Sequence, residues 1–593
     1  MQKLRVYYST SGGSGNLGTE GDPVSRGEAI TRAHAFIAAG GDKVFLIGYG
    51  GDYPPLSMTS LDNRIEFRNY PKQEVRVFAG QRIPGAWTGP DADGVYTKSV
   101  SGTFRDLYVN DIRATRARST DVSTGDTNFT LAAHGWTDAA SKISALARPQ
   151  DVELVGTNFW KMFRVRVASA VGTSVTVADP DWADSQYHKN LPSYDFSMNM
   201  VRWYENAKEL VKNGTGYWYH DRNASVLYYK PRAGEVMGTV EVIAGQSEEA
   251  LSFVGDLDDT DRQLSFRGIK LGWTTYLTPD SYGMSPLQAT VLVRTGGDTY
   301  AKTKASVNVN KARGVEFHGC TIKHCGGDGL GVEFGSKDVG FYNGVIDDTG
   351  GNGVNIGDVT HYFDDPFPTD DREILERITI ENNLFQHIAE VQWSGIGIFK
   401  AYGKNFKIKH NELNDLPYTG ISLGFGWGYN DYQHPFSGSH IWPIHLLLGR
   451  PTPSRQTVQD GHEVQYNKVV NYGLKLDDNG GIYLVGALPN TSVKGNYVYT
   501  QNAKFPFHQS YYLDNGCSGV TLEDNVADGF QGRFINAQYG VPFARNCTIR
   551  NNWANQGSIL PANITDYGHT MGTNTVGALG ATPLAIKQAS GRY

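Results

Sequence analysis

The sequence predicts an all-β protein built as a parallel β-helix, in which each turn of the chain forms one coil of a solenoid. Three observations lead to this fold class. Glycine supplies 70 of the 593 residues, about 12% against a usual ~7%, which indicates many tight turns. Short strand-like pieces ending in asparagine recur through the C-terminal half, and a second strand-like pattern recurs between them.

The asparagine series sets the period of the repeat. Successive asparagines are 28, 56, 29, 29 and 27 residues apart, and the step of 56 equals two periods or one period with an insertion. In a solenoid with this repeat, each strand pairs with the same strand one coil above and below, ~4.8 Å away. The series consists of Asn383, Asn411, Asn467, Asn496, Asn525 and Asn552.

The second strand of each unit follows a small–apolar–x–apolar template. Because side chains alternate along a strand, the apolar positions are expected to fill the interior while the x position faces outward. Asparagine and glycine at the corners are expected to take left-handed backbone conformations. The six matches begin at Gly329, Gly353, Gly395, Gly420, Gly481 and Ser510.

The rest of the chain predicts a cap and an insertion. Residues 25–54 read as an amphipathic helix, with Ala29, Ala33 and Phe36 on one face, followed by a strand that caps the first coil. Residues 83–245 alternate like antiparallel strands. We therefore expect a cap with the first coils at 1–82, a β-rich insertion domain at 83–245, and the main β-helix with its groove at 246–593.

Composition restricts the partners and the compartment. The net charge of −7 comes without a basic run, so nucleic acid is not expected as a partner. The sequence contains no stretch of 18 apolar residues, so a membrane-spanning helix is not expected. The N-terminus lacks the apolar segment of a signal peptide. We expect an extracellular or periplasmic protein whose leader is absent from the numbered chain, with a cytoplasmic location as the alternative.

Neither a disulfide scaffold nor a cofactor is expected. The four cysteines lack zinc-ligand spacing and are expected to be buried as small apolar side chains. The acidic segment 255–261, "GDLDDTD", is a possible structural Ca²⁺ site without a full ligand pattern, and a solvated turn is the favoured interpretation. The cysteines are Cys320, Cys325, Cys517 and Cys547.

The repeat places two distant acids on one face. Asn467 precedes Ile482 by 15 residues, and Asn496 precedes Tyr511 by 15, so these strands occupy the same place on adjacent coils. Tyr483 and Tyr512 are then outward neighbours. Asp514 faces outward after the second strand, and Asp478 lies in the corner that leads into the first.

A groove with two carboxylates among aromatic rings suits glycoside hydrolysis. One carboxyl group protonates the leaving oxygen, and the other attacks the anomeric carbon or activates a water. The predicted catalytic residues are Asp478 and Asp514, with Asp477 and Glu333 as reserves. The structural alternative is that the acids are turn residues and the tyrosines only stabilise the sheet. The predicted substrate contacts are Trp393, Tyr418, Trp427, His434, Tyr483, His508 and Tyr512.

Four segments resemble the right-handed parallel β-helix proteins of glycoside hydrolase family 141. They are "WYENAKELVKNGTGYWYHDRNASVLYYKPRAGE", "HNELNDLPYTGISLGFGWG", "LDDNGGIYLVGALPNTSVKGNYVY" and "YYLDNG". The resemblance implies a right-handed helix and an α-L-fucosidase-like or xylanase-like activity. The family's Asp in "DGG-IY" falls on Asp478, with Asn479 where Gly is usual. The acid of its "Y-DEG" element falls on Asp514, with Asn515 where Glu is common.

The favoured function is a glycoside hydrolase that acts on a complex plant or algal polysaccharide. One alternative is a polysaccharide lyase, for which Lys400 and Lys475 are the nearest candidate bases. The other alternative is a non-catalytic carbohydrate-binding β-helix, such as an adhesin or a tail-fibre module.

Overall fold

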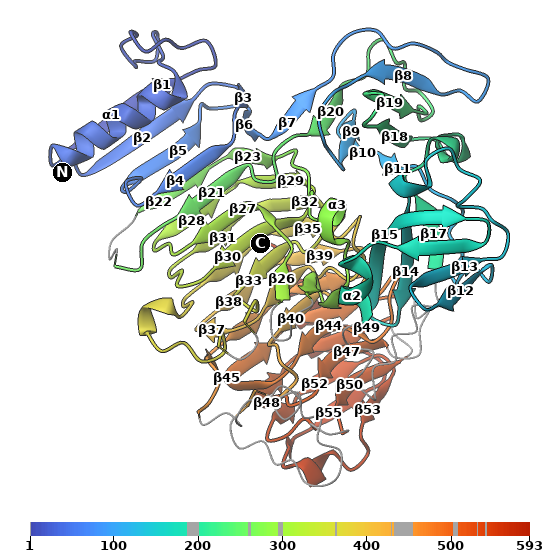
Figure 1. Cartoon of the computed structure of the whole chain (residues 1–593). Coiled ribbons are helices and arrows are strands. Elements are labelled where there is room, and N and C mark those ends of the chain that lie inside the picture. Colours follow the sequence, from blue (N-terminus) through green and yellow to red (C-terminus); the bar gives the residue numbers. More distant parts are fainter. Residues whose placement is uncertain are drawn as a thin grey trace.

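A computed structural model describes residues 2–186, 201–258, 263–294, 300–361, 364–428, 430–431, 455–501, 508–529, 532–539 and 543–593. Three long parallel sheets run the length of the molecule and wrap around one core, which confirms the predicted β-helix (Figure 1). The first sheet runs from β1 (Lys3–Tyr8) to β54 (Thr570–Met571), and another runs from β3 (Gly51–Tyr53) to β55 (Asn574–Val576).

The third sheet, called the site sheet, carries the six strands that the small–apolar–x–apolar template predicts. Adjacent strands pair in parallel, with Ile421 beside Ile482 and Ile482 beside Tyr511. The site sheet consists of β4 (Leu56–Thr59), β21 (Leu251–Val254), β27 (Ala305–Asn310), β30 (Asp328–Glu333), β33 (Val354–Ile356), β36 (Ile398–Lys400), β40 (Ile421–Leu423), β44 (Asn479–Leu484), β47 (His508–Leu513), β50 (Arg533–Ala537) and β53 (Ser558–Leu560).

The asparagine series forms a buried ladder inside the coils. Each side-chain nitrogen donates to the side-chain oxygen of the next asparagine, as from Asn467 to Asn496 at 3.0 Å and from Asn496 to Asn525 at 2.9 Å. These asparagines do not take the left-handed conformation expected of them. The residue before each one does, as at Tyr466 with φ 56° and Asp524 with φ 56°. Turning the chain one residue earlier points the amide inward, where it can bridge coils.

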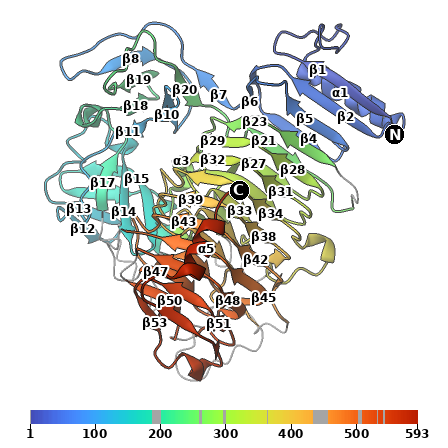
Figure 2. The same cartoon turned by 180° about the vertical axis from the view of Figure 1, so that it is seen from behind.

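The N-terminal cap has the predicted form. Helix α1 (Arg26–Ala38) begins at Ser25, whose hydroxyl accepts from the Glu28 backbone N–H at 3.2 Å. Ala29 and Ala33 are fully buried against the core, and β2 (Lys43–Gly48) follows the helix. At the other end, helix α5 (Ala581–Ala589) turns back along the coils, and Lys587 contacts Asp528 at 3.1 Å (Figure 2).

An insertion leaves the β-helix after β6 (Val75–Phe78) and returns at β21. It contains three small sheets, antiparallel except where β11 pairs with β18, and lies beside the coils (Figures 1 and 2). Its strands are β7 (Gly80–Arg82), β8 (Tyr96–Ser99), β9 (Leu107–Val109), β10 (Ile112–Arg113), β11 (Thr115–Arg116), β12 (Phe129–Ala132), β13 (Gly135–Asp138), β14 (Glu153–Asn158), β15 (Lys161–Val171), β16 (Ser174–Val177), β17 (Val201–Glu205), β18 (Tyr217–Asp221), β19 (Val226–Tyr229) and β20 (Val242–Gly245).

The cysteines are all free and buried, which confirms their interpretation as small apolar side chains. Within the described part of the chain, no helix has the length and apolar character needed to cross a membrane.

Candidate active site

Two stacked tyrosines mark the site on the outer face of the site sheet. Tyr483 of β44 pairs in register with Tyr512 of β47, and their rings lie edge to face with centroids 5.2 Å apart. Both rings are buried with Val485, at 3% and 5% exposure, in a small cluster outside the main core. The Tyr483 hydroxyl donates a hydrogen bond to the carboxylate of Asp514.

Asp478 lies in the corner that leads into β44, as predicted. Its backbone is left-handed, with φ 48°, and its N–H donates to the Asp477 carboxylate at 2.8 Å. Its carbonyl oxygen accepts from the Tyr418 hydroxyl at 3.1 Å. The Asp477 N–H in turn donates to the Phe159 carbonyl at 2.9 Å, so the turn between β14 and β15 of the insertion supports this corner.

The two acids share one electrostatic environment. Burial, followed by the charges of Asp514 and Asp477, raises the pKa of Asp478 to about 7. Burial also raises the pKa of Asp514, against hydrogen bonds from Tyr483, the Asn515 backbone and Tyr512. Interaction with the Tyr512 hydroxyl opposes the rise at each carboxyl group. The two acids therefore form one interacting pair.

Two further predicted contacts lie at this pair. Tyr418 is 1% exposed, and burial raises its pKa, with the charges of Asp478 and Asp514 adding to the rise. Trp427 packs against the tyrosine cluster and lies 5.1 Å from the Phe425 ring. His434 falls outside the described residues.

Two other predicted contacts do not lie at the acid pair. His508 points into the coil, where it is fully buried and packs on Tyr472 at 4.6 Å, because the chain shifts its alternation between Gln509 and Tyr511. Trp393 is 8% exposed. Its ring lies 5.0 Å from Trp203 of the insertion, with Arg202 and Lys475 close to its face, so it packs the interface between the insertion and the coils.

The remaining candidate acids and bases are engaged elsewhere. Glu333 lies 3.3 Å from Lys302, four strands of the site sheet before β44. Lys400 is fully buried inside the coil and 2.9 Å from His462, where no substrate can meet it. Lys475 lies against Trp393. Neither lysine is placed as the base that a lyase requires.

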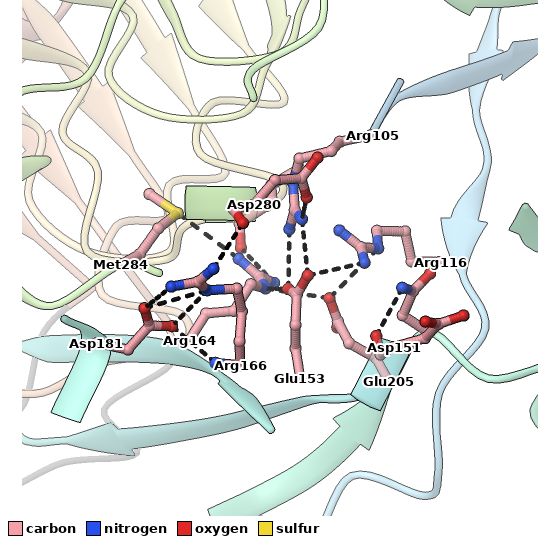
Figure 3. A network of polar contacts seen from close by, with 12 residues as sticks. Arg105, Arg116, Asp151, Glu153, Arg164, Arg166, Asp181, Glu205, Asp280 and Met284 are labelled. Carbon is pink, nitrogen blue, oxygen red and sulfur yellow. Dashed lines mark hydrogen bonds and ion pairs between the residues drawn. The ribbon is translucent and has the colours of Figure 1, made fainter. Parts of the chain in front are cut away.

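An ion-pair network lies within the insertion and reaches beyond it through Asp280, which pairs with Arg105. Glu153 of β14 accepts from Arg105 at 2.7 and 2.8 Å and from Arg116 at 3.0 Å, and lies 3.2 Å from Arg164 (Figure 3). The arginines hold the pKa of Glu153 well below its usual range, against burial. Glu205 joins the network through Arg164 at 3.0 Å.

A cavity of about 140 Å³ lies beside this network. Two of its acids are neutralised, because Asp106 pairs with Arg113 and Glu205 pairs with Arg164. Glu390 also lines the cavity, and burial raises its pKa. The cavity therefore offers one acid of raised pKa, whereas the tyrosine cluster offers two that interact.

The candidate Ca²⁺ segment runs into residues 259–262, which are not described. Elsewhere, no group of three or more His, Cys, Asp or Glu side chains in the described part of the chain is arranged to hold a metal ion.

Sequence reasoning missed several residues around the acids. Phe159 comes from the insertion, more than 300 residues before Asp478, and no pattern in the repeat points to it. Asn536 lies in "FINA" (534–537), which resembles the strand template, but only ten residues separate Asn525 from Ile535 instead of fifteen. A search for the strand template fifteen residues after each asparagine therefore does not find β50.

Comparison with known proteins supports the fold. Residues 290–430 match the family described as "Right handed beta helix region", so the β-helix is right-handed. A solved structure named "Glycoside hydrolase" aligns over 99% of both chains at 21% identity, with a TM-score of 0.78. A lacto-N-biosidase of family 136 from Eubacterium ramulus aligns over 97% of this chain and 68% of its own, at 9% identity and a TM-score of 0.39. No curated protein matches the sequence.

Proposed function

We propose that the protein is a glycoside hydrolase and that Asp478 and Asp514 are its catalytic acids. The observation that carries the proposal is the interacting pair itself: two carboxyl groups outside the core, both with raised pKa, beside the cluster of Tyr483 and Tyr512. A pair whose surroundings keep one member protonated near neutral pH is what general acid catalysis of glycosidic cleavage needs. The likeness in fold to a structure named as a glycoside hydrolase agrees with this function.

The surroundings suggest a role for each acid. Asp478, with a pKa of about 7, holds the shared proton and gives it to the leaving glycosidic oxygen. Asp514 accepts hydrogen bonds from Tyr483, Tyr512 and a backbone N–H, which favour its ionised form. As a carboxylate it either attacks the anomeric carbon or takes a proton from water, and the anomer of the first product distinguishes these two routes.

The substrate class follows from the resemblance to family 141. We infer a complex plant or algal polysaccharide with fucosidic or xylosidic linkages. Nothing in the placement of Lys400 or Lys475 favours the lyase alternative.

The direct test is the pair of substitutions Asp478→Asn and Asp514→Asn. A screen of nitrophenyl glycosides and plant oligosaccharides, with products followed by NMR, first identifies a cleaved linkage. Each variant is then expected to lose about 10³-fold in kcat with an unchanged circular dichroism spectrum. Glu333→Gln, an acid paired with Lys302 away from the site, is the matched control and should retain activity. Near-normal turnover by either Asn variant would remove that residue from the mechanism.

A further inference from the structure

Two buried amides lie near the acids, one on the coil of Asp514 and one on the next coil. Gln509 in β47 and Asn536 in β50 are both fully buried. In the part of the chain that the structure describes, neither the nitrogen nor the oxygen of either amide has a hydrogen-bond partner. A buried polar group without a partner costs folding free energy, so such groups are rare and require an explanation.

Both side chains belong to the outer face that carries the acids. Asn536 pairs in register with Tyr512, which pairs with Tyr483, so the three occupy one outward row. Gln509 pairs with Gly480, where an added Cβ would lie 3.2 Å from the Cβ of Tyr512. That short distance shows that this position also points to the tyrosine side of the sheet.

The asparagine ladder shows that burial alone does not leave amides unsatisfied in this fold. Asn525 is as deeply buried as Asn536, yet its nitrogen donates to the Val493 carbonyl at 2.9 Å and to Asn552 at 3.0 Å. Its oxygen accepts from the Asn496 backbone N–H at 3.0 Å. Inside the coil, therefore, both amide atoms of Asn525 are hydrogen-bonded. The amides of Gln509 and Asn536, in contrast, have no hydrogen-bond partner in the described part of the chain.

The chemistry of these groups indicates what they receive. Each amide presents a donor and an acceptor side by side, and a sugar hydroxyl is itself a donor and an acceptor. Two amides on neighbouring coils thus match neighbouring hydroxyls of a neutral sugar ring. Gln509 and Asn536 carry no charge, which favours a neutral ring, whereas Arg533, in register beside Gln509, is the cation that a uronate or sulfate would use.

We propose that Gln509 and Asn536 form a subsite that binds the ring hydroxyls of a neutral sugar next to Asp478 and Asp514. This inference rests on the proposed function for the identity of the ligand. The subsite is a recognition site: it holds the sugar at the acids but takes no part in proton transfer.

The test compares Asn536→Leu with the matched control Asn525→Leu in the full chain. Leucine has a similar volume and needs no partner. Asn536→Leu should keep or raise the melting temperature, because it removes an unsatisfied amide, while Asn525→Leu should lower it by breaking the ladder. A fall in melting temperature for Asn536→Leu comparable with that of Asn525→Leu would overturn the proposal.

A second readout measures the sugar directly. L-fucose, D-xylose, D-galactose and D-galacturonate are titrated by calorimetry into the Asp478→Asn protein and into the same protein carrying Gln509→Leu or Asn536→Leu. We expect a neutral sugar to bind and each amide substitution to weaken it tenfold or more. Equal affinity in all three proteins, or binding of galacturonate alone, would overturn the subsite.

The two readouts also separate this inference from the proposed function. If the wild-type protein cleaves no glycoside while the amide substitutions still abolish binding of a neutral sugar, the hydrolase proposal fails and the subsite stands. If cleavage depends on Asp478 but the amide substitutions leave KM unchanged, the hydrolase stands and the subsite fails.

Discussion

Two groups of buried acids, one in the insertion and one on the outer face of the β-helix, are affected in opposite ways by their surroundings. Glu153 and Glu205, in the insertion, are surrounded by arginines that hold the pKa of each below its usual range (Figure 3). Asp478 and Asp514 interact through their charges among tyrosines, and the pKa of each is raised. Arg533 lowers the pKa of Asp478 only as the last of several effects.

The difference shows that burial alone does not set the state of an acid. Burial raises the pKa in both groups, and what decides the outcome is whether a guanidinium lies within contact distance. The first group is ionised and joins the insertion to the coils. The second retains a proton that it can give away, at a cost in stability, as expected of a catalytic site.

The largest effect on folding should come from breaking the paired group. Glu153→Gln leaves Arg105, Arg116 and Arg164 buried with less opposing charge, so we expect the free energy of unfolding to fall by about 3–5 kcal/mol. Glu74→Gln, at an ion pair with Lys270 that is largely exposed, should change it by less than ~1 kcal/mol. Denaturant unfolding measures both. Equal effects from the two substitutions would refute the contrast between buried and exposed pairs.

The unpaired group should respond in the opposite direction. Because the folded pKa of Asp478 lies above its unfolded value, ionising it destabilises the fold increasingly from about pH 4 to about pH 7. Asp478→Asn removes this cost, so the variant should be more stable than the wild type above pH 7 by about 1–3 kcal/mol. Below pH 4 the variant and the wild type should have the same free energy of unfolding. Thermal unfolding across this pH range tests the sign, and a variant that is less stable at pH 8 contradicts it.

The smallest effect should come from one hydroxyl. Tyr483→Phe removes the hydrogen bond that stabilises the Asp514 carboxylate, so the pKa of Asp514 should rise further. The acid limb of the pH profile of kcat/KM is then expected to move to higher pH, with about a tenfold loss at its maximum. Tyr497→Phe, whose hydroxyl bonds to Asp528 at 2.9 Å, is the control. An unchanged acid limb would show that Asp514 is not the group that must ionise.

The sequence was sufficient for the fold and for the places of Asp478 and Asp514 at two adjacent strands of the site sheet. A coil repeat converts residue counts into neighbours, so fifteen residues from Asn467 to Ile482 and from Asn496 to Tyr511 were enough to place Tyr483 against Tyr512. The same counting placed Asp478 and Asp514 on one face.

Other features of the site depend on contacts that no repeat encodes. Whether Trp393 stays open depends on the insertion, which covers it with Trp203 and Arg202. Whether His508 points into the coil or outward depends on a local break in the alternation of side chains before Tyr511. The sequence template assumes regular alternation and so does not predict this break. The unsatisfied amides become visible only when every donor and acceptor around them is known.

The central claim is that Asp478 keeps a proton at neutral pH because it is buried, with the charge of Asp514 beside it. Carbon-13 NMR of aspartate carboxyl groups, with the Asp478 signal assigned by its loss in Asp478→Asn, measures this directly. We expect that signal to titrate near pH 7 in the wild type and at clearly lower pH in Asp514→Asn. A midpoint for Asp478 below pH 5 in the wild type, or one that does not move in Asp514→Asn, would contradict the account.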